Sequence, residues 1–169
     1  NIAKEYVNKM VDYGSECDFA KDVAIFYPLR VIMSILGVPK EDEPRMLRLT
    51  QELFGGRDED MIRDESETSS ESNTITDFFE YFNALTEDRR KNPTNDVSSV
   101  IANAQINNEQ LGHLEAMSYY VIIATAGHDT TSSSTAGGIL ALIENPDQLS
   151  KLKNNPNLMT SAVEELSLI

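Results

Sequence analysis

The stretch from residue 109 to residue 145 constrains the fold most, because it contains no proline and its glycines are the only helix breakers. As one helix it is about 55 Å long at ~1.5 Å per residue. Within it, residues 119–126 are apolar all round, which predicts burial on every side. Residues 127–134 place Gly, Asp, Thr and Ser inside a helix, where each costs roughly 0.5–1 kcal/mol relative to Ala. Such local weakness is typical of functional sites.

The spacing within this weak segment suggests what it does. Thr130 lies four residues after Ala126, so its hydroxyl can donate to the Ala126 carbonyl in place of the backbone ladder. Gly127 leaves room beside that turn, and Asp129 adds a carboxylate. We therefore expect a widened turn that holds a diatomic ligand and a few ordered waters.

The rest of the chain predicts an all-α fold with no domain boundary. One predicted helix carries apolar residues at helical spacing: Ile75, Phe78, Phe79, Phe82 and Leu85. Its three phenylalanines are expected to lie in the hydrophobic core of the protein. Pro28 is expected to start or kink the helix that contains it. The charged residues 57–72 predict a solvated loop, and a turn is expected at 107–108. The expected helices other than the long one are 2–13, 23–36, 39–53, 74–91, 96–104, one from 146 and one from about 157.

Charge and cysteine content exclude several classes of protein. The net charge of −14 argues against binding to nucleic acid or to an anionic membrane surface. No apolar stretch reaches the ~20 residues that span a bilayer, and the chain opens without a signal-peptide pattern. The lone Cys17 excludes an internal disulfide and is interpreted as an ordinary thiol. A cytoplasmic protein is expected.

Six consecutive residues match the oxygen-binding signature of cytochrome P-450 enzymes: Ala or Gly, Gly, any residue, Asp or Glu, Thr, and often Thr or Ser. They are Ala126, Gly127, His128, Asp129, Thr130 and Thr131. The flanking segments 19–39 and 145–165 also resemble helices that precede and follow this signature in bacterial members. The resemblance covers almost the whole chain. The sequence of residues 119–134 is most similar to the corresponding sequence of bacterial enzymes that hydroxylate monoterpene alcohols such as terpineol and linalool.

The resemblance implies a haem-thiolate monooxygenase that inserts one atom of dioxygen into a C–H bond of a small apolar, terpenoid-like substrate. It implies two catalytic residues: Asp129 relays protons, and Thr130 hydrogen-bonds iron-bound peroxide and holds water. His128 stands at the variable position and is expected to make an ordinary polar contact. The residues expected to line the oxygen groove are Ala126, Gly127 and Thr131, and those expected to contact substrate are Ile122 and Ala126.

The same resemblance implies haem b as cofactor, with its axial cysteine outside this chain. Electrons are expected from NAD(P)H through a ferredoxin reductase and a ferredoxin, and the full-length protein is expected to be monomeric. Residues 1–169 are interpreted as the central part of a single domain, inactive alone. Glu165 is expected to be the structural Glu of the family's Glu-x-x-Arg pair, but Leu168 stands where that pair has Arg.

Two other classes of protein remain open. His128-Asp129 with His113 upstream resembles the His and His-Asp ligands of metal-dependent, all-helical phosphohydrolases. With only two histidines in the chain, that pattern has no further ligands. The third alternative is a non-catalytic helical module that binds a partner.

Overall fold

The computed structural model describes residues 1–55 and 70–167, with side chains given outside 54–73. The regular elements of the described residues are helices apart from one short hairpin, which confirms the predicted all-α class. They form two compact units. The core unit comprises Leu29–Ala126, and the terminal unit comprises Asn1–Pro28 together with the described residues from Gly127 on.

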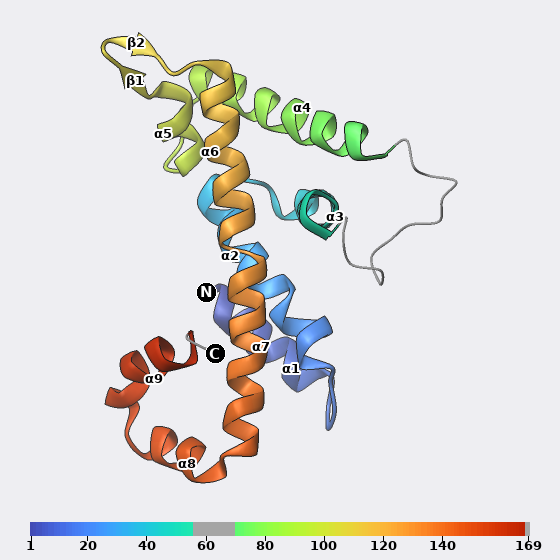
Figure 1. The fold of residues 1–169 in the computed structure, drawn as a ribbon, viewed down its shortest axis with the longest axis vertical. Helices are drawn as coiled ribbons and strands as arrows, with labels where there is room; N and C mark the ends of the chain where they lie inside the picture. The colour runs from blue at the N-terminus through green and yellow to red at the C-terminus, as the bar shows by residue number, and fades with distance from the viewer. Residues whose placement is uncertain (56–69, 168–169) are drawn as a thin grey trace. The chain divides into compact units, whose positions relative to one another are not determined.

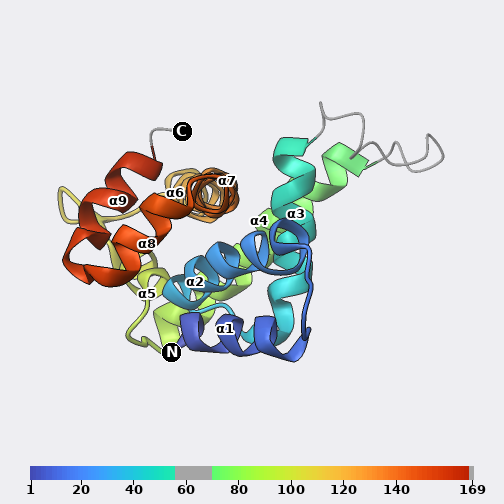
Figure 2. The ribbon, with the colours of Figure 1, turned by 90° about the horizontal axis from the view of Figure 1, so that it is seen from below.

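The core unit is built from helices that pack around α4 (Figures 1 and 2). Both α3 and α5 pack against α4, and α6 contacts α4 and α5. The elements of this unit are most of α2 (Phe26–Leu36), η2 (Lys40–Asp42), α3 (Glu43–Gly55), α4 (Ser70–Lys91), α5 (Val97–Asn103), β1 (Gln105–Ile106), β2 (Glu109–Gln110) and α6 (His113–Ala126).

Aromatic stacking between α4 and α6 lies at the centre of the core unit. The rings of Phe82 and Tyr120 stack with centroids 4.5 Å apart, and Phe78 packs against Phe82 at 4.6 Å. All three side chains are buried, and Thr86 donates its hydroxyl proton to the Tyr120 hydroxyl over 3.0 Å. Phe79 packs against this core as predicted, whereas Ile75, at the start of the same helical spacing, is 46% exposed.

A polar network joins the ends of α2, α4 and α5. Asp96 is the N-cap of α5 and accepts a hydrogen bond from the Ser99 backbone N–H at 2.7 Å. It also pairs with Arg89 at 2.7 Å, and Arg89 donates to the carbonyl of Gly37 at 3.1 Å. Gly37 ends α2 with a φ of +72°, where a Cβ would lie 2.0 Å from an Asp96 carboxylate oxygen. This position therefore requires glycine.

The hairpin β1–β2 carries the predicted turn. Asn107 and Asn108 have φ values of 54° and 66° and connect two antiparallel two-residue strands. Two consecutive positive φ values are the geometry of a type I′ turn, which Asn tolerates better than most residues.

In the terminal unit, α8 and α9 fold back beside α7 (Figures 1 and 2). The contact between α7 and α9 is close, because a Cβ on Gly138 would lie 3.2 Å from the side chain of Leu166. The buried residues of the remaining elements are few and include Tyr6, Val23 and Ala24. The elements are α1 (Ile2–Asp12), η1 (Ala20–Ala24), α7 (Asp129–Glu144), α8 (Pro146–Asn154), η5 (Pro156–Leu158) and α9 (Met159–Leu166).

The predicted helix 23–36 is divided by a π-helical turn. Residues Ala20–Ala24 form η1, and the Ile25 N–H donates to the Ala20 carbonyl five residues earlier at 3.2 Å. The α-helix α2 then begins at Phe26, two residues before Pro28, which confirms that a helix starts near this proline. Pro28 has no N–H to offer the carbonyl of Ala24, so it is tolerated in the first turn of α2, but a regular α-helix cannot extend back from it to Ala24.

Two other predicted boundaries are corrected. The single helix over 109–145 is wrong, because Glu109–Gln110 form a strand, α6 begins at His113, and the helix is interrupted at residues 127–128. The predicted loop 57–72 falls mostly outside the described residues. Its last three residues, 70–72, belong to α4. No helix within the described part of the chain is long and apolar enough to cross a bilayer.

Candidate active site

The helix α6 has two unlike faces. Its buried face contributes Ala116, Met117, Tyr120 and Ala124 to the core unit. Its other face leaves Tyr119 and Ile122 exposed, at 50% and 60%, and Ala126 exposed as well. The prediction that residues 119–126 are buried on every side is therefore wrong for this chain. Residues 119, 122 and 126 follow helical spacing and form an exposed apolar stripe on α6.

The stripe ends where the helix is interrupted. Gly127 and His128 are in turn conformation, and α7 begins at Asp129. His128 is the N-cap of α7 with φ −94° and ψ −72°, and its carbonyl accepts from both the N–H and the hydroxyl of Ser132 at 2.9 Å. The local weakness predicted from the residue types thus coincides with a break between two helices.

The polar residues of the signature lie on the first turn of α7, in the terminal unit. Asp129, Thr130 and Thr131 are exposed, and the Asp129 side chain retains 56% of its accessible surface. Carboxylates at this end of a helix are favoured by the helix dipole. Ile122 and Ala126 lie in the core unit, so the expected site residues fall on both sides of the Ala126–Gly127 peptide bond.

His128 is the buried member of the signature. Its exposed fraction is 0%, and its Nε2 lies 2.8 Å from the carbonyl oxygen of Ile25, directly after η1. The polar contact expected for this residue is therefore present. Its partner could not be found from the sequence, because the two residues are 103 positions apart and one of them contributes only backbone.

The residues described here do not form a metal centre. Within residues 1–55 and 70–167, no three His, Cys, Asp or Glu side chains are grouped to hold an ion. His113 and Cys17 are exposed, and His128 is engaged with a backbone carbonyl. The metal-dependent phosphohydrolase alternative has no support in this arrangement.

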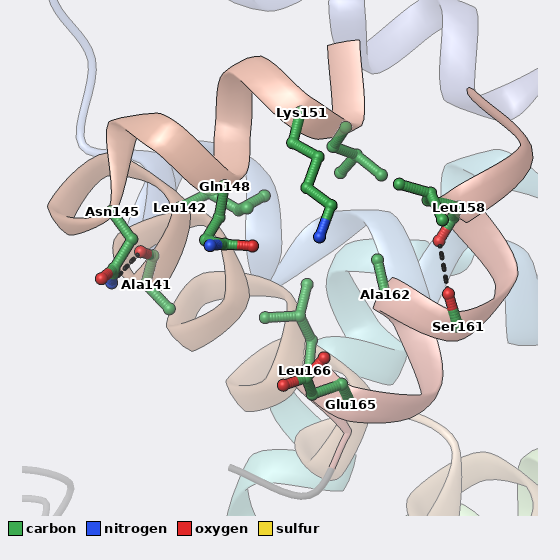
Figure 3. A pocket seen from close by; sticks show the side chains of 11 residues that line it. Ala141, Leu142, Asn145, Gln148, Lys151, Leu158, Ser161, Ala162, Glu165 and Leu166 are labelled. Carbon is green, nitrogen blue, oxygen red and sulfur yellow. Dashed lines mark hydrogen bonds between the residues drawn. The ribbon is translucent and has the colours of Figure 1, made fainter. Parts of the chain in front are cut away.

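Glu165 lies in α9 at a separate hollow of the terminal unit, with a volume of about 370 Å³. Figure 3 shows Lys151 extending toward this hollow from α8, with Glu165 and Leu166 contributed by α9. Glu165 is exposed there. The partner position of the expected Glu-x-x-Arg pair, Leu168, lies outside the described residues.

Comparison with known proteins identifies the family. The sequence profile of Cytochrome P450 matches residues 8–162. Cytochrome P450-terp of a Pseudomonas species is 44% identical over 171 residues, which cover 97% of this chain and 40% of that protein. Cytochrome P450 CYP107DY1 of Priestia megaterium is 32% identical and is matched over 88% of this chain and 35% of its own length.

Solved structures agree with the sequence comparison. The crystal structure of CYP108D1 from Novosphingobium aromaticivorans superposes with a TM-score of 0.85 at 45% identity and covers 98% of this chain and 38% of that one. The chain thus spans roughly two fifths of the length of the proteins that it matches. The profile match and the 44% identity together place it in one family: the chain belongs to the cytochrome P450 family.

Proposed function

We propose that the full-length protein is a haem-thiolate monooxygenase of a bacterial type, and that residues 1–169 are the central part of its single domain. It would hydroxylate a small apolar substrate such as a terpenoid. One oxygen atom of dioxygen enters the C–H bond and the other leaves as water, with two electrons and two protons consumed. The observation that carries this proposal is the break between α6 and α7 at the family's oxygen-binding signature.

The residues on α6 fit a haem and an apolar substrate. The stripe of Tyr119, Ile122 and Ala126 is apolar and exposed in this chain, which suits a helix face that an apolar surface covers. Gly127 at the end of the stripe adds no side chain that would obstruct a flat ring. Cys17, the one cysteine of the sequence, is exposed and belongs to the terminal unit. Bound haem supplies the activation of dioxygen.

The polar residues of the signature would bind water and transfer protons. Thr130 would offer its hydroxyl as a hydrogen-bond donor to dioxygen and to an ordered water in the groove beside Gly127. Asp129 would take protons from solvent, to which its carboxylate is open, and pass them inward. Ala126, Gly127 and Thr131 would line this groove, and Ile122 would contact the substrate one helical turn before Ala126.

Substrate and partners are proposed on the likeness to relatives. The 44% identity to Cytochrome P450-terp and the sequence of residues 119–134 support a monoterpenoid alcohol as substrate. We propose NAD(P)H as the electron source, acting through a ferredoxin reductase and a ferredoxin. A cytoplasmic location and a monomeric state are further predictions.

The test compares Thr130→Ala with Asp129→Asn in the full-length, haem-loaded protein. Thr130→Ala is expected to bind substrate and oxidise NAD(P)H normally, with product replaced largely by hydrogen peroxide. Asp129→Asn is expected to slow turnover by ~10²–10⁴-fold and to enlarge the solvent isotope effect, because a proton relay is removed.

Thr135→Ala is the matched control. Its hydroxyl donates to the Thr131 carbonyl at 2.6 Å within the same helix, so its loss should leave the ratio of product to NAD(P)H unchanged. Equal ratios in wild type and Thr130→Ala would show that Thr130 is only a structural residue of the helix.

A further inference from the structure

His128 occupies the one position of the signature where any residue is allowed, yet it is the most enclosed. Its imidazole has an exposed fraction of 0%, and Nε2 lies 2.8 Å from the Ile25 carbonyl oxygen. A carbonyl oxygen only accepts hydrogen bonds, so Nε2 must carry the proton. The tautomer at this end of the ring is therefore fixed by the backbone that follows η1.

The other ring nitrogen faces the neighbouring carboxylate. Nδ1 of His128 lies 3.4 Å from Oδ1 of Asp129. If Nδ1 carried only a lone pair, that lone pair would face a negatively charged oxygen, which is unfavourable. A proton between the two atoms makes the same geometry attractive, whether it resides mainly on nitrogen or on oxygen.

The ring has little freedom to turn away from Asp129. The backbone carbonyl of His128 accepts hydrogen bonds from the N–H and the hydroxyl of Ser132, both at 2.9 Å. The Nε2 of its ring is bound to the carbonyl of Ile25. With the backbone and the far tip of the ring both fixed, the Nδ1 edge points in one direction. A purely structural role explains the contact with Ile25 but does not require a nitrogen facing Asp129.

We infer that His128 is a positioning residue for Asp129: anchored on the Ile25 carbonyl, it holds one proton against the carboxylate and sets its orientation for proton transfer. The inference rests on the role proposed above for Asp129. It adds a residue at the variable position of the motif and connects the proton relay to the π-helical turn Ala20–Ala24.

Three substitutions in the full-length, haem-loaded protein separate the two ends of the ring. His128→Gln keeps an N–H that reaches Ile25 but leaves nothing facing Asp129. His128→Asn keeps an N–H near Asp129 and loses the anchor. His128→Leu removes both contacts at similar volume.

We expect His128→Gln to keep the melting temperature of the wild type and to lose about tenfold in the rate of product formation, a part of the ~10²–10⁴-fold that a general acid or base contributes. His128→Asn should have a lower melting temperature than the wild type. Its rate of product formation should be several-fold higher than that of His128→Gln. The double variant His128→Gln with Asp129→Asn should be no slower than Asp129→Asn alone. A His128→Gln protein with the turnover and solvent isotope effect of the wild type overturns the inference.

A spectroscopic measurement does not depend on turnover. The measurement is ¹⁵N-histidine NMR of the diamagnetic ferrous carbon monoxide form. The chemical shift of Nδ1 of His128 should differ from that of an imidazole nitrogen that carries only a free lone pair. It should also move when Asp129 is replaced by Asn. An Nδ1 signal at the lone-pair position that ignores this replacement refutes the inference. If Asp129→Asn itself leaves turnover unchanged, the proposed function of Asp129 has failed instead.

Discussion

Asp96 is a residue on which several polar contacts of the core unit converge. Only 7% of its side chain is exposed, and it accepts hydrogen bonds from Thr94, Arg89 and Ser99. Burial alone would raise the pKa of Asp96, but these hydrogen bonds outweigh burial and hold its pKa below the usual value. Asp96 stands at the start of the predicted helix 96–104 and caps α5, and the ion pair with Arg89 adds a second role.

Asp96→Asn separates these two roles. Asn caps a helix about as well as Asp, so the bond to Ser99 should survive while the charge paired with Arg89 is lost. Breaking a buried pair costs roughly 3–5 kcal/mol, and we expect a loss of about 3 kcal/mol in the free energy of unfolding of the full-length protein by urea titration. Asp88→Asn is the control, because Asp88 also pairs with Arg89 but its side chain is 48% exposed. A similar loss in both variants would contradict this assignment.

The lowered pKa of Asp96 also predicts a dependence on pH. A carboxyl group whose pKa is lower in the folded state stabilises the fold fully above its unfolded pKa, ~3.9. The stabilisation is lost as pH falls from there through the folded pKa. The difference in unfolding free energy between wild type and Asp96→Asn should therefore be constant between about pH 5 and pH 8 and shrink below about pH 4. A difference that persists unchanged at pH 3 would argue against the ionised pair.

At the scale of the element, glycines decide where two helices end. Gly14 follows α1 with φ +85°, and Gly37 follows α2 with φ +72°. Each glycine directly follows a predicted helix, 2–13 and 23–36 respectively. Their surroundings differ, because a Cβ on Gly14 would meet nothing within 4 Å, whereas one on Gly37 would overlap Asp96.

Replacing each glycine with alanine should measure this difference. Gly14→Ala should lower the free energy of unfolding by only the cost of a left-handed backbone conformation for alanine, roughly 1–2 kcal/mol. Gly37→Ala should cost about 2 kcal/mol more, because Asp96 must leave its place beside Arg89 and lose charge-assisted hydrogen bonds. Urea titration of the two variants against wild type gives both values. Equal losses would show that Asp96 moves aside freely.

At the scale of the whole molecule, buried apolar residues are concentrated in one unit. The hydrophobic core cluster lies entirely within the core unit, between Leu29 and Ala124. In contrast, α8 and α9 contain no residue that is fully buried, and α7 contains only Gly138. Local stability follows buried apolar contacts, so the described helices should not open equally easily.

Amide hydrogen exchange of a polypeptide of residues 1–169 tests this distribution. Peptides from α4 and α6 should exchange at least about tenfold more slowly than peptides from α8 and α9. The cause is the buried cluster around Phe82 and Tyr120, which has no counterpart in α8 or α9. Equal protection of all these helices would mean that the polypeptide unfolds as one cooperative body.

The sequence by itself determined the helical class, most helix ends and the family signature. Helix periodicity, the cap at Asp96 and the stops at Gly14 and Gly37 are local signals that act within a few residues, so they can be read without the fold. The weak segment after Ala126 was likewise identified from residue types, because Gly, Thr and Ser disfavour a helix interior wherever they occur.

Only the tertiary structure decided which faces and partners these residues have. The burial of His128 against Ile25, the overlap that forbids a side chain at Gly37 and the exposed stripe at Ile122 join positions far apart in the chain or depend on what covers a surface. Residues 119–126 are apolar on all sides, yet one side is exposed here. The hydrophobicity of a helix face indicates that an apolar partner covers it, but it does not indicate which segment or ligand that partner is.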